Sequence, residues 1–73
     1  MRDIKFFDSV ALLEDLPEEN LWRGQVGTTV EIYDNGEAFE VEFVDKSGQT
    51  YGLVTLRPEQ IMLLHYEPAK IAA

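Results

Sequence analysis

The sequence predicts an all-β fold, a small five-stranded antiparallel barrel with one short helical turn before the last strand. Three observations lead to this prediction. The 73 residues suffice for one domain with one modest core. Short runs of β-type residues alternate with turn residues along the chain. Two separate turn signals, Asn35-Gly36 and Ser47-Gly48, bring the same kind of side chain onto one inward face.

Runs of β-branched, aromatic and aliphatic residues mark the predicted strands. These runs cover residues 8–13, 25–34, 38–45, 50–56 and 61–65. Between the first two runs lies an acidic segment, residues 14–24, which we interpret as a long loop. Pro17 and Gly24 keep this segment from continuing a strand, because proline lacks an N–H and glycine weakens strand packing.

The end of the chain predicts the closing elements. Pro58 suits the first position of a helical turn over residues 57–60, because its φ angle is already helical and it needs no N–H there. A last strand over residues 61–65 would then close the barrel. This order of elements predicts one SH3-like barrel domain over residues 1–66 and a flexible tail over residues 67–73.

The turn signals also predict the pairing register. Asn35-Gly36 suits a two-residue type I′ hairpin, because both central residues need positive φ. Alternation of inward and outward side chains is what a half-buried antiparallel sheet requires. The predicted inward pairs are Ile32–Phe39, Val30–Val41 and Thr28–Phe43 in the first hairpin, and Phe39–Leu56, Val41–Val54 and Phe43–Gly52 in the second.

The net charge of −8 indicates the class of partner. Nucleic-acid binders cluster lysine and arginine, whereas the six basic residues are scattered here and fourteen acids repel a polyanion. An acidic surface favours a basic partner or serves solubility alone. The longest apolar run, residues 61–64, is far too short to span a membrane, and no signal-like stretch opens the chain, so we expect a cytoplasmic protein.

No pattern in the sequence indicates catalysis. The absence of cysteine and the presence of one histidine, His65, rule out thiolate sites and histidine clusters. Residues 24–27 form a turn into a strand rather than a phosphate-binding loop that opens a helix. A chain this short also offers little concavity for a buried active site. We therefore expect a non-catalytic protein without a cofactor or a metal site.

The predicted register places acidic residues together on the outer face. Glu31 falls opposite Glu40, and Glu42 follows on the same face. Directly opposed like charges destabilise a sheet, so their presence suggests a role outside the fold. An acidic strip beside an apolar patch predicts a docking surface for a basic, partly apolar protein. The apolar residues expected beside the strip are Val44, Tyr51 and Leu53.

Two interpretations of this face stay open. The alternative to docking is that the glutamates are only solvated and that Trp22 or Phe6 folds over the patch. Trp22 itself is either an anchor for a partner or a plug for the open end of the barrel. The rings of Tyr33 and Tyr51 face either the barrel rim or a ligand. The candidate partner-binding residues are therefore Trp22, Glu31, Tyr33, Glu40, Glu42, Tyr51 and Leu53.

Several segments taken together resemble a bacterial family known as domain of unknown function 4926. They are residues 8–12, 14–17, 21–28, 40–45 and 53–61. The resemblance covers roughly residues 4–64. It implies no established activity and no catalytic residue. It does imply a small partner protein encoded beside another short gene, in the manner of an antitoxin or an immunity protein.

A weaker resemblance supports two rival functions. Residues 23–28 are similar to the KOW-type opening of SH3-like barrels, which implies binding to RNA or to ribosomal and transcription proteins. Nucleic-acid binding would use Arg23, Lys46 and Arg57, although the acidity of the chain departs from that pattern. The other rival is an accessory subunit of a larger enzyme. Self-association through an exposed barrel edge is a further option.

Overall fold

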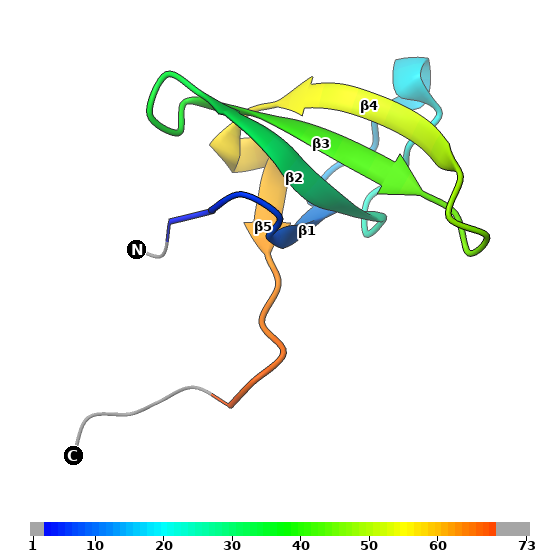
Figure 1. The fold of residues 1–73 in the computed structure, drawn as a ribbon. Helices are drawn as coiled ribbons and strands as arrows, with labels where there is room; N and C mark the ends of the chain where they lie inside the picture. Colours follow the sequence, from blue (N-terminus) through cyan, green and yellow to red (C-terminus); the bar gives the residue numbers. More distant parts are fainter. Residues whose placement is uncertain (1–2, 69–73) are drawn as a thin grey trace.

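The computed structural model describes residues 3–68, which form five strands and two short 3₁₀ turns (Figure 1). The elements are β1 (Ser9–Leu12), η1 (Pro17–Glu19), β2 (Val26–Tyr33), β3 (Ala38–Val44), β4 (Thr50–Leu56), η2 (Pro58–Gln60) and β5 (Ile61–Leu63). The all-β class and the helical turn before the last strand are confirmed. The strand β5 ends two residues earlier than expected.

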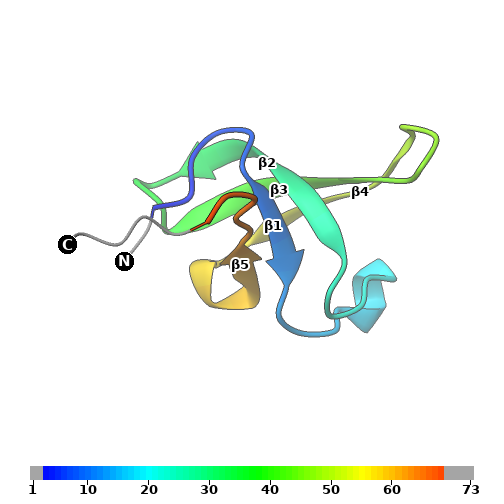
Figure 2. The same ribbon diagram turned by 90° about the horizontal axis from the view of Figure 1, so that it is seen from below.

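The strands form a single antiparallel sheet in the order β4-β3-β2-β1-β5. This is the strand order of an SH3-like barrel. β2, β3 and β4 make one curved layer, and β1 and β5 cross beneath it (Figures 1 and 2). Within residues 3–68 no pairing joins β4 to β5, so the two edge strands are linked through η2 rather than by a ladder.

The core lies between the two parts of this curved sheet. Ile4 also packs against it, so the segment before β1 is docked on the barrel. The predicted tail, residues 67–73, lies outside the described residues except for its first two, which are exposed. The buried apolar cluster consists of Val10, Leu12, Leu16, Leu21, Phe39, Val41, Phe43, Leu56 and Ile61.

The acidic loop between β1 and β2 contributes to this core, which the sequence pattern did not reveal. Pro17 begins η1, and the backbone N–H groups of Leu16 and Leu21 donate to each other's carbonyls at 2.8 and 3.1 Å. This small loop turns Leu21 inward, where none of its surface is exposed. Trp22 next to it is 58% exposed. The expectation that Trp22 plugs the barrel is wrong, because Leu21 occupies that role.

The pairing of β3 with β4 follows the predicted register except next to the turn, where Val44 pairs with Thr50. Phe39 pairs with Leu56, Val41 with Val54, and Phe43 with Gly52. The turn between them is held by the Asp45 carboxylate. That carboxylate accepts hydrogen bonds from the Ser47 hydroxyl (2.6 Å) and from the backbone N–H groups of Ser47 (2.9 Å) and Gln49 (3.1 Å). These bonds hold the pKa of Asp45 below its usual value.

The pairing of β2 with β3 follows the predicted register only near the hairpin turn. Ile32 pairs with Phe39 and Glu31 with Glu40, as expected. The predicted turn needs positive φ at Asn35 and Gly36. In the structure the run of positive φ begins one residue earlier and covers Asp34, Asn35 and Gly36. The register outside the turn is unaffected, since Tyr33 still pairs with Ala38.

A β-bulge at Val30 overturns the rest of that prediction. Thr29, not Val30, lies opposite Val41, and Thr28 lies opposite Glu42 rather than Phe43. One extra residue in a strand reverses which side chains face inward beyond it. Thr29 is therefore fully buried and Gly27 also faces the core, while Thr28 joins the outer face.

Candidate functional site

Five of the predicted site residues share the outer face of the β2–β3–β4 layer. Glu31 lies directly opposite Glu40, and Glu42 lies directly opposite Leu53. Tyr33 follows Glu31 on the same face of β2, because side chains two residues apart in a strand point the same way. We call these residues, Glu31, Tyr33, Glu40, Glu42 and Leu53, the outer strip.

Two threonines of β4 contribute to the outer strip. The Thr55 hydroxyl donates to a carboxylate oxygen of Glu40, and the Thr50 hydroxyl donates to Glu42 at 2.6 Å. Neither threonine is among the predicted site residues. The predicted register would have found Thr55, since it lies opposite Glu40, but Thr50 reaches Glu42 only because of an irregularity in the β3–β4 pairing.

The charge of the outer strip is not balanced by nearby bases. In the part of the chain that the structure describes, the single ion pair joins Arg57 to Glu59 at 3.1 Å and includes no carboxylate of the strip. Partial burial together with the charges of Glu40 and Glu31 and a hydrogen bond to Glu40 raises the pKa of Tyr33 above its ordinary value. The ring of Tyr33 thus lies in the negative field of these carboxylates.

The outer strip is open to solvent. Leu53 is 58% exposed, and Val26 and Val44 on the same face are also exposed. Trp22 and Phe6 are each more than half exposed themselves. The alternative in which these two rings fold over the patch is therefore wrong, and a contiguous surface of carboxylates and apolar side chains is accessible.

Tyr51 does not belong to this surface. The β3–β4 pairing shifts after Phe43, so that Val44 pairs with Thr50 and Tyr51 is the extra residue. The Tyr51 ring packs against the buried ring of Phe43, with centroids 6.2 Å apart. The prediction that Tyr51 lies beside Leu53 on the outer face is wrong, because Tyr51 lies in this second bulge and its ring, 46% exposed, packs against Phe43.

Tyr51 is instead linked to Trp22, another predicted site residue. The side chain of Gln25 connects the two, since its amide donates to the Tyr51 hydroxyl at 3.0 Å and its carbonyl oxygen accepts from the Trp22 backbone N–H. The predicted site residues therefore divide into the outer strip and two residues, Trp22 and Tyr51, that Gln25 links at the loop between β1 and β2.

Two of the three basic residues considered for nucleic-acid binding lie at opposite ends of β4. Lys46 lies in the turn before β4 and Arg57 directly follows β4. The seven residues of that strand place them about 20 Å apart, at about 3.3 Å per residue. Arg57 is also engaged by Glu59. No observation in residues 3–68 favours a phosphate-binding footprint.

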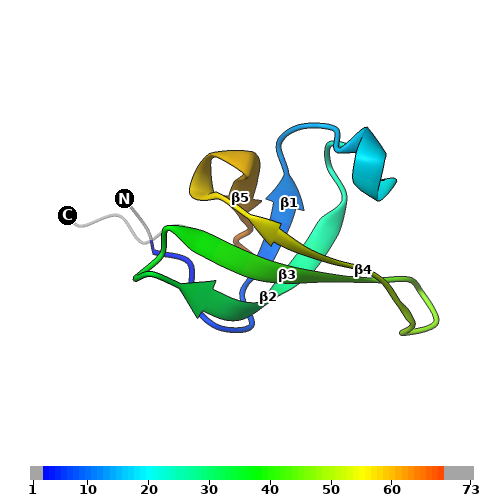
Figure 3. The same cartoon turned by 90° about the horizontal axis from the view of Figure 1, so that it is seen from above.

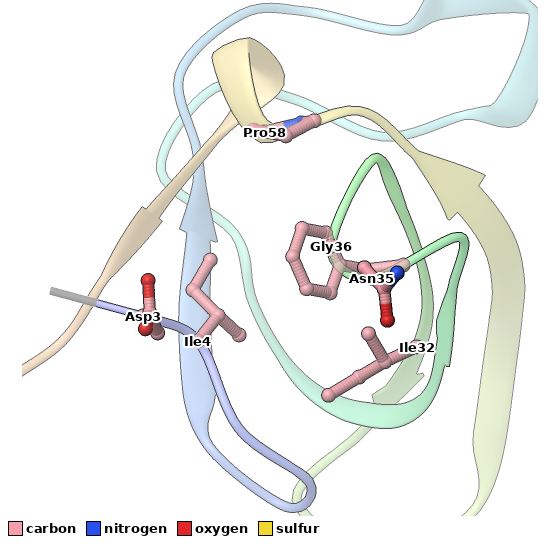
Figure 4. Close-up of a pocket in the computed structure, with 7 residues that line it drawn as sticks. Asp3, Ile4, Ile32, Asn35, Gly36 and Pro58 are labelled. Carbon is pink, nitrogen blue, oxygen red and sulfur yellow. The ribbon is translucent and has the colours of Figure 1, made fainter.

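A groove lies at the end of the molecule that carries the β2–β3 turn. Its volume is about 430 Å³. Figure 4 shows Ile4 and Ile32 on opposite sides of it, with Pro58 of η2 beyond. The lining residues are Asp3, Ile4, Ile32, Asn35, Gly36, Phe39 and Pro58. Apart from the Asp3 carboxyl group and the Asn35 amide this lining is apolar, and Ile32 separates it from the outer strip by packing against the core.

Removing one charge of the opposed pair should stabilise the fold. We expect Glu31→Gln to raise the free energy of unfolding by about 0.2–1 kcal/mol, because a carboxylate directly opposite Glu40 is destabilising. The gain should shrink at high salt, which screens exposed charges. Urea denaturation of both proteins at low and high salt measures it.

The same variant provides a local readout. Because the charge of Glu31 contributes to the raised pKa of Tyr33, Glu31→Gln should lower that pKa toward its ordinary value in an NMR titration of the ring. An unchanged pKa of Tyr33, or a stability gain that does not depend on salt, would contradict the electrostatic account of the outer strip.

No helix among residues 3–68 is long and apolar enough to cross a membrane.

Comparisons with known proteins identify the family. Searches of curated proteins and of solved structures found no match. A family model described as Domain of unknown function (DUF4926) matches residues 6–63, a span that takes in all five strands. The chain therefore belongs to the DUF4926 family.

Proposed function

We propose that this protein is a non-catalytic interaction module that binds a basic protein in the cytoplasm through the outer strip. One observation carries the proposal: three carboxylates, those of Glu31, Glu40 and Glu42, lie side by side on an open sheet face that no base of the described chain neutralises. Their mutual repulsion costs stability in the free protein. A partner that brings lysine or arginine to this face would relieve that repulsion.

The apolar component of the outer strip favours a protein over a small cation as the partner. Leu53 is more than half exposed between the carboxylates and the edge of the sheet, and Val44 and Val26 extend the apolar area. Apolar surface gains free energy only when a partner covers it and removes it from water. Acidic groups around such a patch add specificity for a basic surface and speed the encounter.

Charge reversal on the strip is the direct test. We expect Glu40→Lys combined with Glu42→Lys to weaken binding of the partner at least about tenfold, because both attractive contacts become repulsive. The partner is first captured from cells of the source organism with the tagged wild-type protein and identified by mass spectrometry. Its affinity for purified wild-type and variant proteins is then measured in solution.

A matched control separates the outer strip from bulk charge. Glu18→Lys with Glu19→Lys makes the same change in net charge on the exposed turn η1, away from the strip. This control should retain the partner. Equal loss of binding in both double variants, or full binding by the strip variant with its fold intact by circular dichroism, would overturn the proposal.

A further inference from the structure

The strand β4 has an unpaired edge that borders the outer strip. β4 is the last strand of the sheet and pairs only with β3 (Figures 1 and 3). Within the described chain, residues 50–56 make no backbone hydrogen bond outside that pairing. Every second N–H and C=O of β4 therefore points away from the sheet, where another strand can pair with it.

This edge lacks the features that usually prevent strand addition. Natural edge strands are blunted by charges, by proline or by being very short. β4 has seven residues, none charged and none proline, and Val54 and two threonines favour extended structure. The bulge at Tyr51 disturbs only its beginning, so residues 52–56 present a regular edge. By contrast β5, the other edge strand, has three residues.

The side chains next to this edge indicate what kind of strand would add. Adjacent strands lie about 4.8 Å apart, so an added strand would lie about 10 Å from β3. On the outer face, Leu53 lies between that position and Glu42, and Thr55 lies between it and Glu40. A lysine or arginine on the added strand reaches across this distance, with its aliphatic stem on Leu53 and its charge at the carboxylate.

The inner side of the edge has a different character. Val54 is only partly buried although it packs against the core cluster. A small apolar side chain on the added strand would complete its burial. Successive side chains of a strand point to opposite faces, so basic residues over the outer strip alternate with apolar residues beside Val54.

We propose that the partner docks by adding an extended segment, in which basic and β-branched residues alternate, to the free edge of β4. This inference rests on the proposed function and specifies how the outer strip is used. Backbone hydrogen bonds along residues 52–56 hold the segment, and Glu40 and Glu42 select its basic side chains.

A second copy of this chain does not fit the same edge. Each chain carries a net charge of −8, and pairing of two β4 strands would join two outer strips into one continuous acidic sheet. We therefore expect the purified protein to be a monomer. A dimer in which the amides of β4 are already protected from solvent exchange would overturn the proposal.

The test uses short synthetic peptides and the full chain. The first peptide alternates lysine and valine, and the second has the same composition with the lysines and valines in separate blocks. The third is the alternating peptide with N-methyl groups on every second residue. It is made in two versions, one methylated at the odd positions and one at the even positions, which are its two phases. Binding is measured by titration at low salt, and amide exchange of residues 52–56 is followed by NMR. The alternating peptide should bind at least about tenfold more tightly than the block peptide, whose side chains cannot place lysine over the outer strip and valine beside Val54 in alternation. It should also bind at least about tenfold more tightly than one phase of the methylated peptide, which loses the backbone bonds.

The outcomes separate the docking mode from the proposed function. Tighter binding of the alternating peptide together with slowed exchange in β4 supports strand addition. Equal binding of all peptides, lost in the Glu40→Lys, Glu42→Lys variant but without slowed exchange, overturns strand addition and leaves the charge-based function standing. Failure of every peptide to bind at low salt contradicts strand addition; capture of a partner that the charge reversal releases would then still support the function.

Discussion

Leu21→Ala should unfold most of the protein at room temperature. Leu21 is completely buried, and truncating a buried leucine typically costs about 2–5 kcal/mol because a cavity remains. A core of this size leaves only about 3–5 kcal/mol of net stability. We expect the variant to lose the dispersed amide signals of its NMR spectrum, and urea denaturation to show little or no folded baseline.

Trp22→Ala is the matched control for this prediction. It removes a much larger side chain from the next position in the chain, but that side chain is 58% exposed. Surface substitutions of this kind usually change stability by less than about 0.5 kcal/mol. If Trp22→Ala destabilised the protein as much as Leu21→Ala, this result would indicate that Trp22, and not Leu21, is the buried side chain of the loop between β1 and β2.

This pair of residues also shows where prediction from the sequence fails. An acidic segment with one tryptophan suggests that the large ring is the apolar anchor. The choice of Leu21 depends instead on η1 and on the two hydrogen bonds between Leu16 and Leu21, which set the direction of both side chains. No period of two or of 3.6 residues exists in a loop to reveal such a direction.

The strands themselves were predictable because local signals agree. The bounds of β4 match the predicted run, and the other strands differ by one or two residues at their ends. Asp45, Ser47 and Gly48 form a compact turn between β3 and β4, and the predicted register is confirmed where residues 39–43 pair with residues 52–56. Beside the turn, Val44 pairs with Thr50, one residue out of the predicted register, and the bulge at Tyr51 restores that register for the rest of the two strands.

The bulges were not predictable from the same signals. Val30 has strong β propensity, and nothing in its neighbours indicates an extra residue there. The bulge arises from tertiary structure: β2 pairs with β3 along one part and with β1 along another, and an extra residue accentuates the bend that this requires. It leaves a polar side chain, Thr29, buried, and its hydroxyl has no hydrogen-bond partner among residues 3–68.

Residues of the candidate site were placed correctly wherever the predicted strand register was correct. Glu31 pairs with Glu40 and Glu42 pairs with Leu53 in the predicted registers, so the sequence placed these four residues on one face. Tyr51 lies within a bulge, and the prediction failed there. The outer strip was predictable from the sequence, whereas the link from Tyr51 through Gln25 to the Trp22 loop is visible only in the structure.

Gly27→Ala should strongly destabilise the protein, and it tests the bulge directly. A Cβ at position 27 would lie 2.6 Å from Cγ1 of Val41 and 2.9 Å from the carbonyl oxygen of Glu42, far inside normal contact distances. β3 is paired on both sides and cannot retreat, so we expect a loss of about 1–3 kcal/mol in urea denaturation. Gly52→Ala is the control, because its Cβ would make an ordinary contact with Phe43 at 3.6 Å and should be tolerated.

The comparison of these two glycines decides between two registers of β2. Without the bulge, Val30 and Thr28 would face the core and Gly27 would face solvent, where an added methyl group would meet little resistance. With the bulge, Gly27 faces the core against Val41. Equal stability of the Gly27→Ala and Gly52→Ala proteins would therefore contradict the bulge and support the regular hairpin register. Pronounced destabilisation of Gly27→Ala alone would show that the extra residue at Val30 sets which β2 side chains border the outer strip.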